Sequence, residues 1–283
     1  MSAGLEPLDG IVLVDKPAGM TSFSATAAVR RSLGVPKAGH SGTLDPFATG
    51  LLIVLVGRAR RIQRFFMAMP KTYEAVAQFG AVSTTGDPEG EITSTGVVPA
   101  DPLRLVSGRI MQRPPAFSAI HVDGVRAYER ARRGEDVVIP EREIIVYAFE
   151  QQWRDADRAG LHISCSSGTY VRSLVADLGD AYTAELRRTS IGPFGVADAD
   201  PERVIPLADV LGFFAAVDVD AATAARVGYG QRVTVADVPK QPTGAWLLPE
   251  PPAEILVRDE AGPIALATRD ADGELKPIVG FRS

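Results

Sequence analysis

Asp45 has the sequence context of a residue that could do chemistry. It lies in a loop with glycines at positions 39, 42 and 50, directly before an apolar run, 51–56, that is typical of a buried strand. A carboxylate on a tight loop at the mouth of a sheet can reach a ligand, and an aspartate there can serve as nucleophile or acid/base in glycosidic-bond chemistry. Taken alone, the Asp45-Pro46 dipeptide favours a plain turn, because Asp-Pro commonly initiates turns.

Three other residues could act with such a carboxylate. Arg172 is expected in the first turn of a helix, where the helix dipole disfavours a cation, so a nearby carboxylate or phosphate would offset that cost. A solvated surface arginine is the alternative. The ring of Tyr73 could stack on a base and its hydroxyl could move a proton, or the residue could pack in a core. His40 could stack, form a hydrogen bond or have a structural part in its loop.

The elements that must position these residues follow from apolar periodicity and turn residues. Strands are expected at 10–15, 51–56, 73–79, 143–150, 160–166 and 185–192. Helices are expected at 21–33, 59–69, 101–112 and 169–182. The first helix has Thr21 or Ser22 as its cap and Gly34 at its end. The pattern predicts an α+β fold, with a mixed, largely antiparallel sheet and flanking helices.

Two parts of the chain differ from this scaffold. Residues 121–143 carry a short basic helix with little apolar surface, which predicts a projecting, mobile insertion. Its arginines are Arg126, Arg130, Arg132 and Arg133. After about residue 215 the chain changes to short β-like runs with acidic residues. We therefore predict a catalytic domain at 1–218 and a small, mostly β domain at 219–283.

The composition permits a nucleic-acid partner without requiring one. The net charge is −5, but residues 1–70 hold eight Lys/Arg against four Asp/Glu, whereas 198–283 hold eight against fourteen. Affinity for phosphate follows the local field rather than the total charge. A lone Cys165 cannot form an internal disulfide, and three histidines make a structural zinc site unexpected. No apolar run approaches the ~20 residues of a membrane-spanning helix and no secretory signal is visible, so the cytoplasm is the expected compartment.

Five motifs follow one another in a fixed order. They are Asp15-Lys16-Pro17-x-Gly19, Gly39-His-Ser-Gly-Thr-Leu-Asp-Pro46 with Gly50-Leu-Leu52, Lys71-Thr-Tyr73, Gly168-Thr-Tyr-Val-Arg172 and Leu186-Arg-Arg188. In order and spacing they resemble the TruB family of tRNA pseudouridine synthases over about residues 9–195. The basic insertion is similar to the mobile RNA-gripping segment of that family, and the C-terminal stretch resembles a shortened PUA domain.

This resemblance implies an enzyme that converts uridine at position 55, in the T-loop of tRNA, to pseudouridine. The C1′–N1 glycosidic bond breaks and C1′ rejoins C5 of the base, after the nucleotide has been flipped out of its stack. The resemblance assigns Asp45 as the essential carboxylate. Desolvation disfavours an ionised aspartate, so Arg172 is our candidate for the cation that keeps it charged. Tyr73 would stack on the flipped base and help to remove the C5 proton.

The resemblance also implies how RNA is held. Leu186 would pack against the flipped base, and His40 would help to hold the flipped-out loop. Lys16 would support the active-site loop or touch a phosphate. The arginines of the insertion would contact phosphates. The expected partner is tRNA, through the T-loop and T-stem with the acceptor stem as a further candidate contact. No metal, no cofactor and no obligatory protein partner are expected, and a monomer is the default.

Three alternatives stay open at this point. The chain could be the catalytic subunit of a guide-RNA particle, as archaeal and eukaryotic relatives are, although the basic insertion favours the stand-alone bacterial type. It could be an RNA chaperone or binding module, but Asp45 would repel phosphate in a pure binder. A glycosidase is remote, because the second carboxylate that such enzymes use is not apparent near Asp45.

Overall fold

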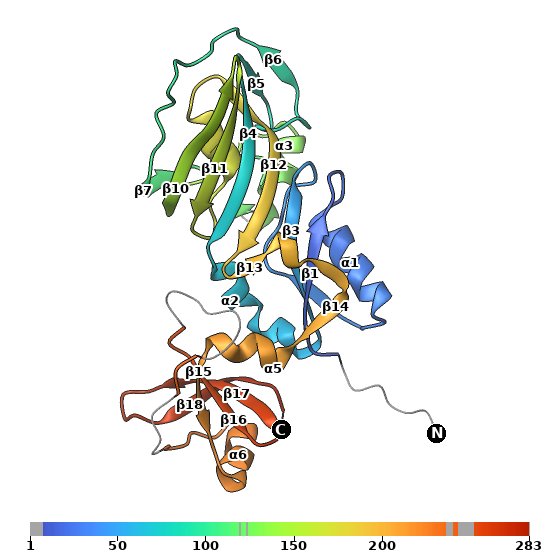
Figure 1. Ribbon diagram of the computed structural model, residues 1–283, viewed down its shortest axis with the longest axis vertical. Helices are drawn as coiled ribbons and strands as arrows, with labels where there is room; N and C mark the ends of the chain where they lie inside the picture. The colour runs from blue at the N-terminus through green and yellow to red at the C-terminus, as the bar shows by residue number, and fades with distance from the viewer. Residues whose placement is uncertain (1–7, 119, 123, 236–239, 243–251, 283) are drawn as a thin grey trace.

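The computed structural model describes residues 8–118, 120–122, 124–235, 240–242 and 252–282, and it is dominated by one large sheet (Figure 1). Within these residues the sheet has ten strands in the order β14-β1-β3-β12-β4-β11-β10-β7, with β13 beside β12 and β2 beside β3. The strands are β1 (Gly10–Lys16), β2 (Ala38–His40), β3 (Thr49–Val56), β4 (Lys71–Phe79), β7 (Gly108–Gln112), β10 (Arg142–Asp155), β11 (Arg158–Cys165), β12 (Ala181–Ile191), β13 (Phe194–Gly195) and β14 (Asp200–Pro206).

The two halves of this sheet meet at a short parallel junction. Arg187 of β12 pairs with Thr49 of β3, and Arg188 pairs with Gly50, whereas the other strand pairs of the sheet are antiparallel. Gly50 has a positive φ of 104°, and a Cβ at this position would collide with the backbone of Arg188. The predicted mixed, largely antiparallel sheet is confirmed.

Helices and short hairpins flank the sheet. They include α1 (Ser22–Ser32), the 3-10 helix η1 (Gly57–Ile62), α2 (Gln63–Ala68), α3 (Ala127–Arg132), α4 (Val171–Ala176), η2 (Val196–Asp198), α5 (Leu207–Val210) and η3 (Leu211–Phe213), with the hairpins β5 (Ala81–Ser83) to β6 (Ile92–Ser94) and β8 (His121–Val122) to β9 (Val125–Arg126). The predicted first helix is confirmed. The hydroxyl of Thr21 accepts from the N–H of Ser24, and Gly34 has a positive φ after the helix.

Three helix predictions need correction. The predicted helix at 101–112 is wrong: residues 108–112 are strand β7, which pairs with β10. The short apolar pattern of this segment fits the period of a helix as well as that of a strand. Pairing with β10 at the edge of the sheet makes it a strand. The predicted helix at 169–182 is much shorter, because α4 ends at Ala176 and β12 begins at Ala181. Thr169 donates to the Ser166 carbonyl instead of capping α4. The predicted helix at 59–69 is η1 followed by α2.

A second sheet lies near the C-terminus, with strand order β15-β16-β17-β18. Its elements are β15 (Ala215–Asp218), α6 (Ala221–Gly228), β16 (Ile255–Asp259), β17 (Gly262–Arg269) and β18 (Leu275–Gly280). Strand β15 stands just before the boundary expected at residue 219, and the division into 1–218 and 219–283 stays a prediction. Helix α6 was not expected. Asp220 caps it by accepting from the N–H of Thr223 at 2.7 Å.

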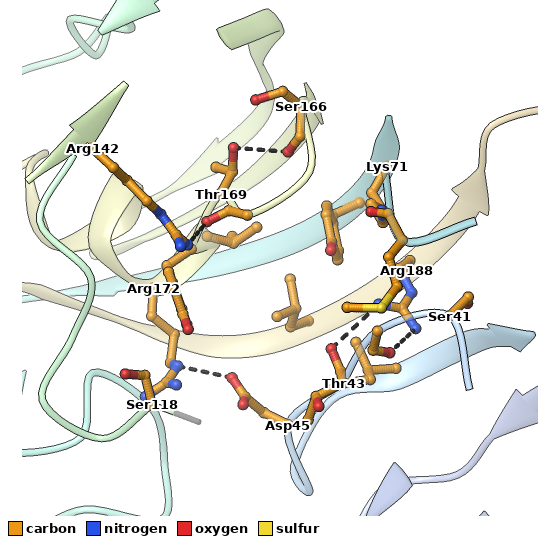
Figure 2. Close-up of a pocket in the computed structure, with 18 residues that line it drawn as sticks. Ser41, Thr43, Asp45, Lys71, Ser118, Arg142, Ser166, Thr169, Arg172 and Arg188 are labelled. Carbon is orange, nitrogen blue, oxygen red and sulfur yellow. Dashed lines mark hydrogen bonds and ion pairs between the residues drawn. The ribbon is translucent and has the colours of Figure 1, made fainter. Parts of the chain in front are cut away.

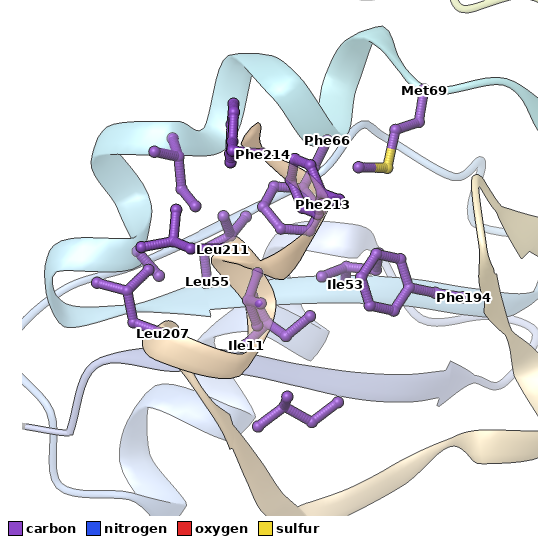
Figure 3. Packing of buried hydrophobic residues seen from close by; sticks show 14 of the residues in the cluster. Ile11, Ile53, Leu55, Phe66, Met69, Phe194, Leu207, Leu211, Phe213 and Phe214 are labelled. Carbon is purple, nitrogen blue, oxygen red and sulfur yellow. The ribbon is translucent and has the colours of Figure 1, made fainter. Parts of the chain in front are cut away.

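One of the buried hydrophobic clusters joins the two sheets. Phe66 of α2 packs near Phe213 (Figure 3). Both belong to the same buried cluster as Leu256 and Leu266 of the C-terminal sheet. The guanidinium groups of η1 strengthen this contact, because Arg58 donates to the carbonyl of Phe281 and Arg61 to that of Gly280. In Figure 1 the C-terminal sheet accordingly lies below α2 and α5.

Candidate active site

A cavity of about 290 Å³ lies where the Asp45 loop, the middle strands and α4 meet (Figure 2). Tyr73 of β4 and Leu186 and Arg188 of β12 line it from the sheet, since Ala75 pairs with Leu186 and Tyr73 with Arg188. The other lining residues are Ser41, Gly42, Thr43, Leu44, Asp45, Met67, Lys71, Ser118, Arg142, Ser166, Gly168, Thr169, Tyr170, Val171 and Arg172. The structure thus brings four of the predicted residues, Asp45, Tyr73, Arg172 and Leu186, to one cavity.

The loop that carries Asp45 is fixed from both sides. The hydroxyl of Ser22 donates to the carbonyl of Leu44 at 2.9 Å and accepts from its N–H at 2.8 Å. The N–H of Gly19 donates to the carbonyl of Pro46 at 2.8 Å. The loop that leads into α1 and the first turn of that helix therefore hold the residues before and after Asp45, and the carboxylate is presented on a rigid support.

Asp45 forms an ion pair with Arg172. The distance from Arg172 Nε to Asp45 Oδ2 is 2.9 Å, and the Arg172 side chain is only 4% exposed whereas that of Asp45 is 32% exposed. Arg172 NH1 also lies 3.3 Å from Oδ2 of Asp87, which is itself buried. NH2 donates to the carbonyl of Phe117 at 2.9 Å. The carboxylate that the sequence predicts beside this helix-terminal cation is therefore that of Asp45, with Asp87 as a second one.

The charges around Asp45 oppose one another. Burial raises the pKa of this carboxyl above its usual value, and the negative charge of Asp87 adds to that rise. The positive charges of Arg172 and Lys16 lower it. Two buried cations thus oppose the desolvation that disfavours the ionised form of Asp45.

Lys16 supports the loop that carries Asp45. Its side chain is fully buried, and the ammonium donates to the carbonyls of Pro17 at 2.9 Å, Met20 at 2.7 Å and Pro46 at 3.2 Å. Burial lowers the pKa of Lys16 to about 8, an effect that the charge of Asp45 partly opposes. A phosphate contact would require the ammonium to leave these three carbonyls, so the geometry favours the supporting role.

Replacing Lys16 by methionine tests this role. We expect turnover of the predicted RNA substrate to fall about 10- to 100-fold, because a small displacement of the carboxylate predicted to react is costly, while the Kd for that RNA changes less than about twofold. Single-turnover rates and binding isotherms separate the two effects. Lys37→Met, which removes an exposed lysine, is the matched control. A rise in Kd with a weaker salt dependence for the Lys16 variant would instead identify a phosphate ligand.

Two residues that sequence reasoning did not assign complete the site. Arg188 is buried, and its guanidinium donates to the carbonyls of Leu51 at 2.7 Å, Gly42 at 3.3 Å and Thr43 at 3.4 Å, so it fastens the Asp45 loop to β12. The Leu186-Arg-Arg188 motif was a signal for it. Asp87 lies in the turn between β5 and β6, where nothing in the sequence marks its burial against Arg172.

Tyr73 and Leu186 form an apolar wall of the cavity, each 8% exposed. Burial raises the pKa of the Tyr73 hydroxyl, and the guanidinium of Arg188 opposes that rise. The hydroxyl is thus a neutral hydrogen-bond donor at ordinary pH, with a cation beside it that can stabilise a transient phenolate.

His40 lies beside the cavity rather than in its lining. It ends β2, its Nδ1 accepts from the N–H of Gly42 at 3.3 Å, and its carbonyl accepts from Gln63 at 2.8 Å. Burial lowers the pKa of His40, with Arg188 contributing, so the imidazole is neutral. A neutral ring can stack or hydrogen-bond, and both roles expected for it remain predictions.

None of the four arginines of the insertion lines the cavity. Helix α3 is tied to it, because the N–H of Tyr128 donates to the carbonyl of Ser118, a lining residue, at 3.0 Å. Arg126, Arg132 and Arg133 are exposed. Arg130 pairs with Glu135, and Arg132 lies over the ring of Tyr128. Their contacts with RNA stay predictions.

Two negative observations apply to the part of the chain that the structure describes. No three His, Cys, Asp or Glu side chains gather there in a way that could hold a metal ion. No helix among those residues is long and apolar enough to cross a membrane.

Comparisons with known proteins match both the sequence and the fold. The family described as TruB family pseudouridylate synthase (N terminal domain) matches residues 30–171. A tRNA pseudouridine synthase B of Xanthomonas oryzae pv. oryzae (strain MAFF 311018) is 38% identical over 298 residues, which cover 96% of this chain and 93% of that protein. The protein of the same name from Corynebacterium glutamicum (strain R) is 42% identical over 214 residues, which cover 69% of this chain and 71% of the relative.

Solved structures share the fold at lower identity. The chain titled "Structure of H/ACA RNP bound to a substrate RNA containing 2'-deoxyuridine" superposes with a TM-score of 0.64 at 21% identity, covering 98% of this chain and 86% of that one. The chain of "Crystal structure of the archaeal box H/ACA sRNP Nop10-Cbf5 complex" also gives 0.64, at 22% identity, covering 97% of this chain and 86% of that one. At this identity the likeness concerns the fold alone.

Proposed function

Because the chain belongs to the TruB family of pseudouridylate synthases, we propose that it isomerises the uridine at position 55 of the tRNA T-loop to pseudouridine, with Asp45 as the reacting carboxylate. The observation that carries the proposal is the Asp45–Arg172 ion pair at 2.9 Å in a cavity walled by Tyr73 and Leu186. The cavity holds about 290 Å³, which suits one flipped nucleotide and not a helical stem.

Polar residues in the lining of the cavity support a polar ring as its occupant. Besides Asp45 and Arg172, the lining includes Ser41, Thr43 and Ser118. Buried polar groups normally find partners, and uracil offers two carbonyl oxygens and one ring N–H. The apolar ring faces would meet Tyr73 and Leu186.

The proposed reaction is balanced without a co-reactant. The C1′–N1 bond breaks, the base turns, C1′ bonds to C5, the proton of C5 leaves and N1 gains one. Asp45 can attack C1′, attack the ring or deprotonate the sugar, and each route begins from the ionised carboxylate. Arg172 serves all three in the same way, because it lowers the pKa that burial raises.

Tyr73→Phe tests the proton transfer assigned to the hydroxyl. We expect turnover to fall about 10²-fold, as for a lost acid/base group, while tRNA affinity stays within about threefold because the ring remains. Tritium release from C5-labelled uridine at saturating enzyme measures the step. Preserved release would remove the proton-transfer role and leave stacking alone.

The partner expected for this chain is tRNA alone. Relatives named tRNA pseudouridine synthase B are bacterial and 38% to 42% identical, which supports a stand-alone enzyme that works without an obligatory protein partner. We propose that it acts as a monomer in the cytoplasm. We further propose that the C-terminal sheet is a PUA-like unit that reaches toward the acceptor stem.

The test is release of tritium from an unmodified tRNA transcript labelled at C5 of uridine, with wild-type enzyme and no metal, guide RNA or second protein. Release that maps to the T-loop is the expected result. Tight, salt-sensitive tRNA binding without release would instead favour an RNA chaperone or a subunit that needs partners.

A further inference from the structure

The basic insertion carries its own competing anion. Glu135 Oε2 lies 2.7 Å from Nε of Arg130, and Glu135 Oε1 lies 3.4 Å from NH1 of Arg133. One carboxylate therefore contacts two of the four arginines that the sequence marks as phosphate ligands. Its two oxygens meet guanidinium groups as the two free oxygens of a phosphodiester would.

The backbone fixes this arrangement. After α3 the chain turns at Gly134, whose φ is 77°. The N–H of Gly134 donates to the carbonyl of Ala131 at 2.9 Å, and the N–H of Glu135 donates to that of Arg130 at 3.2 Å. These two bonds form a Schellman motif, which returns the residue after the glycine to the last turn of the helix. The sequence Arg130-Ala-Arg-Arg-Gly-Glu135 thus places its final carboxylate against its first guanidinium.

We infer that Glu135 is a specificity-determining residue, which an RNA must displace from Arg130 and Arg133 before its phosphates can bind there. This inference rests on the proposed function as a tRNA-modifying enzyme and on the RNA-gripping role that the family resemblance implies for the insertion. An RNA shaped to present phosphates to both arginines at once replaces both contacts. An RNA that reaches only one arginine leaves the carboxylate in place and gains little. Glu135 therefore weakens binding of all RNA, and weakens binding of the wrong RNA most.

Glu129, on helix α3 of the same insertion, provides a matched control. Replacing either glutamate by glutamine removes one negative charge from the insertion. The Glu129 carboxylate accepts from the hydroxyl of Tyr128 at 3.1 Å, and the Arg133 Nε contact in this region goes to the backbone carbonyl of Glu129, not to its side chain. Glutamine at 135 keeps the side-chain length and the backbone motif, so folding is preserved.

The experiment measures Kd against salt for a tRNA transcript and for an unstructured RNA of equal length, with wild type, Glu135→Gln and Glu129→Gln. Glu135→Gln should bind tRNA about 3- to 10-fold more tightly at low salt, and the unstructured RNA by a larger factor. Its log–log salt slope should steepen by about 0.7–0.9, the equivalent of one further phosphate. Glu129→Gln should shift either Kd less than about twofold.

Equal shifts for the two variants would show a plain net-charge effect and overturn the inference. Weaker binding by Glu135→Gln would overturn it as well, because the carboxylate would then be orienting the arginines for RNA. Tritium release by the wild type, assayed on the same preparation, tests the proposed function separately. Tritium release by the wild type together with equal Kd shifts for the two variants would refute only the role of Glu135. Tighter RNA binding by Glu135→Gln alone, without tritium release by the wild type, would refute only the proposed catalysis.

Discussion

Asp45→Asn is expected to abolish pseudouridine formation, with a loss of about 10⁴-fold, while tRNA binding persists. Asparagine fills the same space but can neither act as a nucleophile nor accept a proton, and such groups account for losses of this size. The measurement is tritium release from C5-labelled tRNA under single-turnover conditions. Filter binding on the same transcript gives the Kd, which should stay within about threefold of wild type.

Folding of the Asp45→Asn variant is the control, and its expected sign follows from the raised pKa of Asp45. A group whose pKa is raised in the folded state holds its proton more tightly there, so the ionised form opposes folding at neutral pH. Asparagine removes that cost, and the melting temperature should not fall. Full turnover by a folded variant would exclude Asp45 from the chemistry.

Arg172→Gln is expected to lower turnover about 10³-fold and to destabilise the fold by about 3–5 kcal/mol. Removing one partner of a buried ion pair leaves an uncompensated charge, here on Asp87, whose side chain is 4% exposed. Asp45, at 32% exposed, adds less to the stability loss but more to the activity loss. Thermal or urea unfolding gives the first quantity, and single-turnover tritium release gives the second.

The pH profile separates the electrostatic role of Arg172 from a purely structural one. Activity that needs ionised Asp45 falls as pH drops through the pKa of that carboxyl, which burial holds above 3.8. Loss of Arg172 raises this pKa further, so the acid limb of the profile should move to higher pH. Asp87→Asn removes a like charge and should move it to lower pH. Shifts in the same direction for both variants, or none, would contradict this account.

The sequence allowed the local parts of the fold to be predicted, and failed where distant segments decide. Helix α1 was predicted because its cap at Thr21 and its terminating Gly34 lie within the segment itself. The segment 101–112 was predicted wrongly, because its conformation depends on pairing with β10, about 35 residues away. The predicted length of helix α4 was too great, because the apolar spacing of its sequence continues past the end of the helix into β12, which pairs with β4.

The candidate site divides in the same way. Asp45, Tyr73 and Arg172 were found because each lies in a short motif of fixed spacing. Asp87 was not, because only the packing of its turn against α4 makes it a second partner of Arg172. For Lys16 the residue was predicted, but its role could not be. Its motif was visible, but its burial beneath three carbonyls, which decides between support and phosphate contact, is a tertiary property.

The buried cluster that joins the two sheets also determines how the molecule unfolds. Phe66, Phe213, Leu256 and Leu266 lie in one buried cluster, so separating the sheets would bare aromatic and aliphatic surface on both. Loss of either sheet should therefore destabilise the other, although each also has a buried cluster of its own. Removing the C-terminal sheet would expose the apolar surface of the joining cluster on α2 and leave an aggregation-prone remnant.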